Sequence, residues 1–218
     1  MSARGHRGSI GLCLVTDSTA SGGRTPGAIA LAAISGGVDL IQVREKHLPG
    51  RELLLLVREI VDGLRAARVR ARVVVNDRLD VALAAKAAGV HLPSEGLPTS
   101  GVRERCSKKI LIGRSVHSLA EARQAEKEGA DYVFFGPVFD TPSKVAFGPP
   151  QGVAALRKVV SAIRLPVWAI GGINGATVGE LAGIPLAGIA AISAFTGAED
   201  PAAVARSLRE ALGAPEGA

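Results

Sequence analysis

The sequence predicts an α/β protein built as a single (β/α)8 barrel, the TIM-barrel architecture. Short runs rich in β-branched residues alternate with longer amphipathic runs along the whole chain, as in a parallel sheet covered by helices. Eight strand runs occur, which favours closure of the sheet over the alternative, an open doubly wound sheet. The length of 218 residues fits one domain and lies at the small end for this barrel.

The predicted strands are short apolar runs, as expected where a parallel sheet is buried on both faces. The segment between each strand and the next can hold a connecting helix or loop, which brings the chain back so that the next strand runs parallel to the one before. In chain order they are LCLVTD (12–17), DLIQVRE (39–45), RVVVND (72–77), GVHLP (89–93), ILIGRSV (110–116), YVFFGPVF (132–139), PVWAIGGI (166–173) and GIAAISAF (188–195).

Amphipathic runs between these strands predict the helices. Several begin after Thr, Ser, Asn or Asp, and several end in Gly, as helix termini often do. These runs cover residues 26–37, 50–67, 79–89, 118–130, 152–163, 175–184 and 200–213. We therefore expect a barrel domain over residues 12–212, with flexible segments at 1–11 and 213–218.

Composition narrows the function classes. Hydrophobic residues make up 47% and charged residues 21%, as in an ordinary globular protein. The net charge is +6, but the cations are dispersed and aromatic residues are only 3%, which argues against nucleic acid and leaves anionic small molecules as partners. Cys13 and Cys106 have no paired spacing, so a reducing cytoplasm fits best. Neither a signal peptide nor an apolar run of ~18 residues is evident, so no membrane partner is expected.

Barrels of this type carry their reactive side chains at the C-terminal ends of the strands. The second predicted strand places Gln42, Arg44 and Lys46 at alternating positions, and this period of two directs them to one face while the other face meets apolar helices. A solvated strand end is the alternative. An Arg fork and a mobile Lys charge facing inward would bind a multiply charged oxyanion.

Two further strand ends carry polar or glycine motifs. Asn76 and Asp77 follow the third strand, where they could cap the helix that begins at Leu79 or supply a carboxylate to Mg²⁺ that is shared with substrate phosphates. The Gly171–Gly172 turn follows the seventh strand, where backbone amides favour a phosphate, and Ile192–Ser193 completes that corner. Polar residues at other strand ends are Thr16, Asp17, Arg114 and Ser115.

The stretch FDTPSKVAFGPP (139–150) is too long and turn-rich for a minimal connection. We interpret it as a lid that carries Lys144, with a plain surface loop as the alternative. His91 and His117 have no paired acid or base in the sequence, so both are predicted to be structural. Trp168 and Tyr132 are predicted to lie in the core.

The segments LVTD, QVREK, VVNDR, GVHL, IGRSVHS, GADYVFFGPVF, VWAIGGI and ISAF, in this order, resemble the thiamine phosphate synthase family and its thiazole tautomerase relatives. The resemblance covers about residues 12–212. It implies a TIM-barrel transferase that couples 4-amino-2-methyl-5-(pyrophosphooxymethyl)pyrimidine to thiazole phosphate with Mg²⁺, giving thiamine phosphate and pyrophosphate. Two barrels of this kind often pair, which leaves a homo-oligomer open.

Carried over by position, the resemblance implies three groups of site residues. Cleavage of the C–O bond before coupling would require stabilisation of the departing pyrophosphate, which gives Arg44, Lys46, Ser115 and Lys144 catalytic roles. The pyrimidine diphosphate site would comprise Gln42, Val43, Arg44, Glu45, Lys46, Asn76, Ser115 and Lys144; the thiazole phosphate site, Thr141, Pro142, Ser143, Gly172, Ile192 and Ser193; and the metal site, Asp77.

The chain departs from the family pattern after the fourth strand. Synthases usually show H-L-G-Q-x-D there, the last residue being the second metal ligand, whereas this chain ends the motif with Glu95 and Gly96. Glu95 or water would then complete the metal shell. The loop reads T-P-S-K in place of T-x-T-K, which keeps the hydroxyl.

Three alternatives to the synthase remain. The LPS and GRSVHSLAEA segments lean toward the thiazole tautomerase, but that branch has a histidine where this chain has Pro137, and it often loses part of the QxRxK and ND motifs that are intact here. A non-catalytic phosphate sensor would not require Arg44, Lys46 and Asp77 together. Another barrel enzyme with a phosphate handle would not predict QVREK followed by NDR. The synthase is therefore the favoured prediction and the tautomerase its runner-up.

Overall fold

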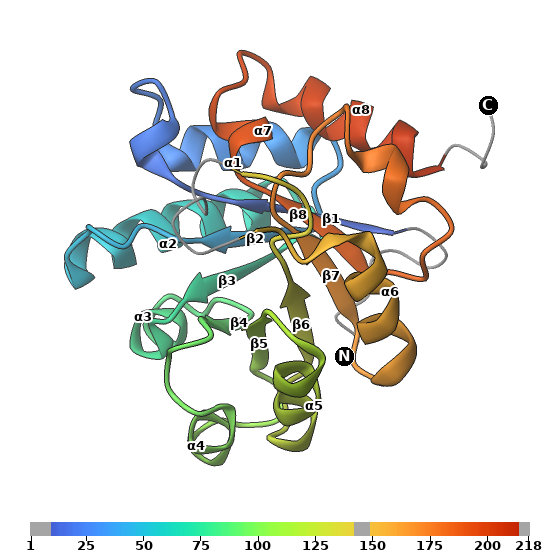
Figure 1. Cartoon of the computed structure of the whole chain (residues 1–218). Coiled ribbons are helices and arrows are strands. Elements are labelled where there is room, and N and C mark those ends of the chain that lie inside the picture. Colours follow the sequence, from blue (N-terminus) through green and yellow to red (C-terminus); the bar gives the residue numbers. More distant parts are fainter. Residues whose placement is uncertain (1–9, 142–148, 214–218) are drawn as a thin grey trace.

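Eight parallel strands form a closed barrel in chain order, which confirms the predicted fold (Figure 1). The computed structural model describes residues 10–141 and 149–213, so most of the two predicted terminal segments lies outside the described residues. The barrel closes where Gly11 pairs with Gly188 in the last strand. The strands are β1 (Gly11–Val15), β2 (Leu40–Val43), β3 (Arg72–Asn76), β4 (Gly89–Leu92), β5 (Leu111–Val116), β6 (Tyr132–Phe135), β7 (Val167–Ile170) and β8 (Gly188–Ala191).

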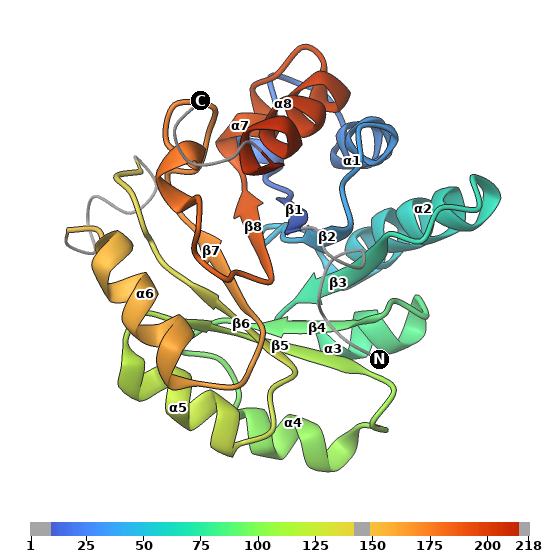
Figure 2. The ribbon, with the colours of Figure 1, turned by 90° about the vertical axis from the view of Figure 1, so that its right-hand side faces the viewer.

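Helices surround the strands on the outside of the barrel (Figure 2). Thr25 and Ser118 cap two of them, because each side chain accepts a hydrogen bond from a backbone N–H of the first turn. Among the described residues, none of the helices combines the length and apolar character needed to cross a bilayer. The helices are α1 (Pro26–Ser35), α2 (Gly50–Ala66), α3 (Leu79–Ala84), α4 (Thr99–Arg105), α5 (Leu119–Lys127), α6 (Gly152–Ala162), α7 (Ser193–Thr196) and α8 (Pro201–Gly213), with 3₁₀ turns η1 (Ser18–Ala20) and η3 (Val178–Leu181).

Some predicted boundaries were wrong. The helix expected at 175–184 is only the turn η3, because Asn174 and Thr177 accept hydrogen bonds from backbone N–H groups and close a local turn. Strand β6 ends before Pro137, which has no N–H to extend a ladder. The run 188–195 is a strand only to Ala191, after which α7 begins. Helix α4 was not predicted, since its sequence TSGVRER has little apolar periodicity.

The alternation of side chains along each strand separates two apolar layers. An inner cluster fills the barrel and includes Leu40, Tyr132, Phe134 and Trp168. The larger outer cluster lies between strands and helices and includes Val43. Tyr132 and Trp168 are 1% and 2% exposed, which confirms both as core residues. Because successive strand residues point to opposite faces, Gln42 lies on the inner side with Leu40.

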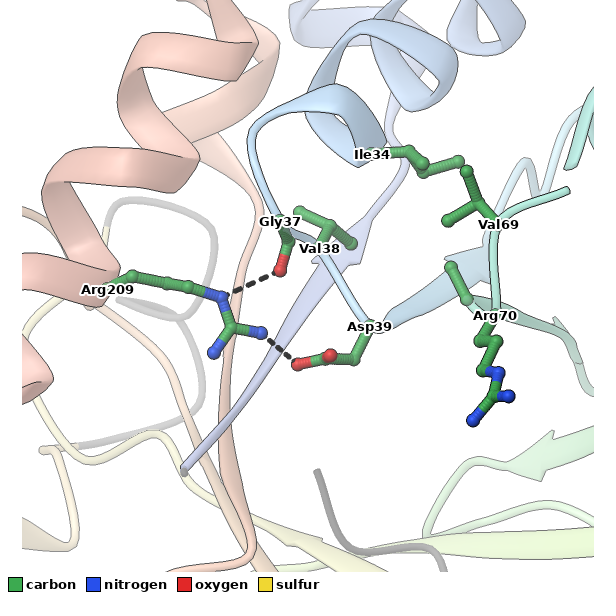
Figure 3. Close-up of a pocket in the computed structure, with 8 residues that line it drawn as sticks. Ile34, Gly37, Val38, Asp39, Val69, Arg70 and Arg209 are labelled. Carbon is green, nitrogen blue, oxygen red and sulfur yellow. Dashed lines mark hydrogen bonds and ion pairs between the residues drawn. The ribbon is translucent and has the colours of Figure 1, made fainter. Parts of the chain in front are cut away.

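An Arg–Asp pair ties α8 to the N-terminal ends of β1 and β2 (Figure 3). The Arg209 guanidinium donates to the carbonyl oxygens of Gly37 at 2.8 Å and Ile10 at 3.2 Å, and it also contacts the Asp39 carboxylate. That carboxylate accepts the backbone N–H of Leu12 at 2.9 Å. One side chain therefore fixes the helix, the loop before β2 and the start of β1 together.

The same set of contacts recurs at the start of β5 and β6. Arg103 of α4 donates to the carbonyl oxygens of Gly129 and Ile110, each at 3.1 Å, and contacts Asp131. Asp131 accepts the backbone N–H of Ile112 at 2.7 Å. Asp39 directly precedes β2 and Asp131 directly precedes β6. The arginines come from α4, which precedes β5 in the chain, and from α8, the last helix, which follows β8, the strand that pairs with β1 in the closed barrel. The same contacts therefore occur at the first two strands of each half of the barrel, β1–β4 and β5–β8. We call this set of contacts the Arg–Asp staple.

Candidate active site

A cavity of ≈ 140 Å³ lies at the C-terminal ends of the strands. Five of the residues predicted to bind the diphosphate line it. They lie on or after three different strands and are far apart in the sequence, from position 42 to position 115. The predicted residues brought together are Gln42, Arg44, Lys46, Asn76 and Ser115. The structure therefore places an amide, two cations, a second amide and a hydroxyl around one space.

Gln42 carries the clearest sign that the cavity takes a ligand. The residue is 3% exposed, and its Nε2 atom has no hydrogen-bond partner among the described residues. An unpaired buried donor costs free energy, so such groups usually have a partner that is protein, water or ligand. The Gln42 amide lines the cavity, where an oxygen-rich ligand would supply the missing acceptor.

Two cationic side chains, Arg44 and Lys46, line the same cavity as Gln42 and are more exposed than it is. The backbone N–H of Arg44 donates to the Thr16 hydroxyl at 3.0 Å, and its guanidinium lies 3.5 Å from the Asp17 carboxylate. The Arg44 and Asp17 side chains are 27% and 26% exposed, so this pair is screened by water and holds the guanidinium only loosely. Lys46 is exposed at the rim. Both cations remain available to an anion.

Val43 and Glu45 do not line the cavity, although both were predicted to bind substrate. Val43 belongs to the outer apolar layer. Glu45 is 4% exposed, and its carboxylate accepts hydrogen bonds from the backbone N–H of Ser18 at 3.0 Å and from its hydroxyl at 2.6 Å. The odd positions of this segment thus pack and anchor η1, while the even positions face the cavity.

Ser115 is held from below by a buried histidine. The His91 Nε2 atom lies 2.9 Å from the Ser115 hydroxyl oxygen, and its Nδ1 atom lies 3.2 Å from the Tyr132 hydroxyl. Burial lowers the pKa of His91 to about 3, and the nearby Arg114 guanidinium acts in the same direction. Burial also raises the pKa of Tyr132 well above its usual range. Both rings are therefore neutral near pH 7, and His91 is the structural residue that the sequence predicted.

Asp77 lies beside the position where the sequence lacks a second carboxylate. Its backbone has a φ of 62°, a left-handed conformation in which Asp is tolerated better than most residues. A Cβ atom on Gly96 would lie 3.1 Å from the Asp77 Oδ1 atom, so the two positions adjoin in space. Within the described ranges, no three His, Cys, Asp or Glu side chains gather as a metal site. Asp77 and Glu95 are both exposed.

The corner formed by β7 and β8 lies next to the cavity, but only part of it forms the cavity wall. Gly171 lines the cavity, whereas Gly172, Ile192 and Ser193 do not. The carbonyl oxygen of Gly172 accepts the Thr177 hydroxyl at 2.9 Å, which ties the glycine turn to η3. Ser193 is exposed at the start of α7. The thiazole phosphate roles of these residues stay a prediction.

The predicted lid is described only in part. Thr141 precedes the gap in the described ranges, and Pro142, Ser143 and Lys144 lie outside the described residues. Arg114, grouped with the polar strand ends, donates instead to the carbonyl oxygens of Leu97 at 2.6 Å and Ser94 at 2.7 Å. It therefore fixes the loop after β4.

Sequence reasoning missed several residues of the cavity wall. Most are apolar residues, glycine or proline, which carry no polar signal in the sequence; the exceptions are Ser94 and His117, the latter predicted to be structural. Period-two alternation along β6 could have identified Phe134, since it shares a face with Tyr132. The additional lining residues are Val15, Pro93, Ser94, His117, Phe134, Gly136, Pro137 and Ile170. A hydrophobic wall beside polar groups is typical of sites for small organic ligands.

A second pocket of ≈ 340 Å³ lies at the opposite end of the barrel (Figure 3). Ile34, Val38 and Val69 form its apolar side, and the Arg209–Asp39 pair borders it. It contains none of the predicted site residues. Because reactive groups of these barrels collect at the C-terminal strand ends, the smaller cavity is the candidate active site.

Comparison with known proteins gives a consistent picture. The family model described as thiamine monophosphate synthase matches residues 12–195. A thiamine-phosphate synthase of Methanoculleus marisnigri is 46% identical over 206 residues, covering 93% of this chain and 95% of that protein. A putative thiamine-phosphate synthase of Geobacter sulfurreducens is 44% identical over 197 residues, covering 90% and 92%. These matches do not support the tautomerase alternative.

Solved structures agree with the fold. Thiamine phosphate pyrophosphorylase from Pyrococcus furiosus superposes with a TM-score of 0.83 at 37% identity, covering 93% of this chain and 95% of that one. A 3-hexulose-6-phosphate synthase from Salmonella typhimurium has a TM-score of 0.70 at 19% identity, covering 93% and 98%. At that identity the second likeness concerns the barrel alone.

Proposed function

The chain belongs to the thiamine monophosphate synthase family, and from this premise we propose how its cavity carries out thiamine phosphate synthesis. The enzyme is a transferase that couples the phosphorylated pyrimidine to thiazole phosphate and releases pyrophosphate. The observation that carries the proposed site is the unpaired Gln42 Nε2 atom in a cavity that Arg44 and Lys46 also line. We place the diphosphate of the pyrimidine substrate there.

Departure of pyrophosphate is the step that these residues serve. If the C–O bond breaks first, negative charge grows on the leaving group and a pyrimidine-methyl cation remains. Arg44 and Lys46 would stabilise that charge, with Asn76 and Ser115 donating hydrogen bonds. Each well-aligned contact can contribute ~2–4 kcal/mol at the transition state, by analogy with oxyanion donors. Lys144, which lies outside the described residues, would add a cation from the lid.

The lining favours leaving-group stabilisation over general base catalysis. The described part of the wall contains no carboxylate, and the buried His91 behind it keeps a pKa of about 3 because of desolvation. A base works best with a pKa near the operating pH, which His91 does not have. His117 also lines the cavity, and its Nδ1 atom contacts the Gly136 carbonyl oxygen. Apart from this imidazole, the wall offers hydrogen-bond donors and cations, which suit a reaction in which bond cleavage precedes attack by the thiazole.

The thiazole phosphate is proposed to bind at the corner of β7 and β8. The Gly171–Gly172 turn, with φ values of 100° and 68°, and the first residues of α7 bring backbone groups close to the cavity rim. Gly172, Ile192 and Ser193 would hold the phosphate together with Thr141 and the neighbouring lid residues. This would set the thiazole beside the reacting carbon.

Mg²⁺ is proposed as the cofactor, with Asp77 as its protein ligand. Mg²⁺ is commonly held by one or two carboxylates plus substrate phosphates, so one exposed carboxylate near a diphosphate site fits this mode. Bound Mg²⁺ would offset the charge of the diphosphate. Since Gly96 supplies no side chain, Glu95 or water would complete the shell.

A cytoplasmic location and pairing of two copies stay predictions. The free cysteines Cys13 and Cys106 are compatible with a reducing compartment. Neither property enters the proposed chemistry.

The test is a coupled assay on purified protein supplied with the pyrimidine diphosphate, thiazole phosphate and Mg²⁺. We expect thiamine phosphate and pyrophosphate in equal amounts. Arg44→Ala should lower kcat by two or more orders of magnitude, about 3 kcal/mol. Arg123→Ala removes an exposed cation of α5 that does not line the cavity, and it should leave kcat unchanged. Near-normal turnover by Arg44→Ala would contradict the role proposed for this guanidinium.

A further inference from the structure

Three neighbouring strands place a tyrosine, a histidine and a serine in one hydrogen-bonded chain. His91 of β4 is in register with Gly113 of β5, which is in register with Tyr132 of β6. A Cβ atom on Gly113 would lie 2.2 Å from Tyr132 Cζ and 2.5 Å from His91 Nδ1. Only glycine at this position leaves room for the Tyr132–His91 contact, so the strand sequence itself makes space for the chain.

The direction of the hydrogen bonds follows from burial. Within the described part of the molecule, the hydroxyl of Tyr132 has one partner, His91 Nδ1 at 3.2 Å, and the tyrosine is 1% exposed. The phenol proton must therefore be donated to Nδ1, since the reverse direction would bury it without an acceptor. A neutral imidazole that accepts at Nδ1 carries its proton on Nε2. That proton is donated to the Ser115 oxygen at 2.9 Å.

Ser115 is consequently left with its own proton to donate. Its hydroxyl is partly exposed and lines the cavity, where the proton can reach a ligand or water. A Ser–His contact of this length would also suit an activated nucleophile, but there the histidine accepts the serine proton. Here Nε2 is already protonated. The geometry excludes His91 as the base of Ser115 and makes the serine a donor.

We propose that Tyr132 and His91 are positioning residues that hold Ser115 as a hydrogen-bond donor toward the diphosphate. This inference rests on the proposed function for the identity of the ligand, but not for the direction of the chain. The tyrosine acts through the histidine, and the histidine acts through the serine. Neither ring needs to touch the substrate.

The first measurement is the tautomer of His91 in the free enzyme. Protein labelled with ¹⁵N-histidine contains four imidazoles, and the signals of His91 are identified by their loss in His91→Gln. Long-range ¹H–¹⁵N spectra at pH 8 should show a neutral ring with its proton on Nε2. A proton on Nδ1 would overturn the proposal, whatever the enzyme's activity.

The second measurement is the affinity for inorganic pyrophosphate, used as a probe by calorimetry at fixed salt. Tyr132→Phe and Ser115→Ala should each raise Kd by about tenfold. Because the two groups act in series, the double variant should bind no more weakly than Ser115→Ala alone. Thr99→Val is the matched control, since it removes a fully buried hydroxyl that has no hydrogen-bond partner among the described residues. Its Kd should equal that of the unmodified enzyme.

The outcomes separate the two proposals. Unchanged pyrophosphate affinity in Tyr132→Phe, or additive losses in the double variant, would refute the positioning role. Absence of thiamine phosphate formation, with the Nε2 tautomer and the non-additive losses present, would count against the proposed function alone. If Tyr132→Phe fails to fold, the tautomer of the unmodified enzyme still decides the direction of the chain.

Discussion

Removal of either arginine of the two Arg–Asp staples should destabilise the barrel by a similar amount. Arg209→Met keeps the aliphatic stem but loses two hydrogen bonds to the carbonyl oxygens of Gly37 and Ile10 and the contact with Asp39. Asp39 is then left with a charge that is only 13% exposed and a single described hydrogen bond to Leu12. Asp39 also has a further interaction, so its carboxylate is not left without a partner.

The magnitude follows from the number of lost bonds. A hydrogen bond to a charged group contributes ~1.5–3 kcal/mol, and breaking a buried pair costs ~3–5 kcal/mol. The arginine side chain is 26% exposed, so water replaces part of the loss. We expect the free energy of unfolding to fall by ~3 kcal/mol. With an m value of about 2 kcal/mol/M, the urea midpoint should fall by ~1.5 M.

Arg103→Met should produce nearly the same loss, because Arg103 makes the same contacts to Gly129, Ile110 and Asp131. The two staples share no residue, one lying at the start of β1 and β2 and the other at the start of β5 and β6, so their effects should add within ~0.5 kcal/mol. The double variant would then lose ~6 kcal/mol, a large part of a typical stability of ~5–15 kcal/mol.

The assay is urea unfolding followed by circular dichroism, at equal protein concentration for all variants. Arg65→Met is the control, since its i,i+3 pair with Asp62 joins side chains that are 57% and 68% exposed. That variant should lose no more than ~0.5 kcal/mol. Losses below ~1 kcal/mol for both staple arginines, or equal to that of the control, would refute the reasoning.

Three other predictions concern the site. The pKa of His91 is about 3 in the folded protein and 6.5 ordinarily, so between these pH values only the unfolded chain binds the proton. The free energy of unfolding should therefore fall by ~2 kcal/mol from pH 7 to pH 5. His91→Gln should lack this loss when both proteins are unfolded in urea at each pH. Gly96→Asp would add a carboxylate beside Asp77 and should lower the Mg²⁺ concentration for half-maximal turnover by about tenfold; an unchanged titration would count against a missing ligand. Gly113→Ala should abolish the His91–Tyr132 contact and depress pyrophosphate affinity at least as much as Tyr132→Phe, and normal affinity would show that the contact is dispensable.

Features with a local cause could be predicted from the sequence. The alternation of strand and helix and the count of eight strands follow from side-chain periodicity, which needs no knowledge of partners. The same period of two correctly directed Gln42 to the cavity side of β2. It would also have assigned Val43 to the outer layer, but the motif resemblance grouped both residues as ligands.

Contacts that depend on how the strands are aligned with each other could not be predicted from the sequence. The Arg209–Asp39 contact spans 170 positions, and nothing in either local sequence selects the partner. Likewise His91, predicted only to be structural, gains its role because barrel closure sets it beside Gly113 and within reach of Tyr132.

The sequence by itself therefore determined the order of elements, the kind of barrel and which strand ends carry charge, because these depend on the periodicity and chemistry of neighbouring residues. Only the tertiary structure decided which of those ends share one cavity and in which direction the Ser115 hydroxyl donates. The physical reason is that hydrogen bonds between strands form only after the stagger of the closed sheet has set which residues face each other.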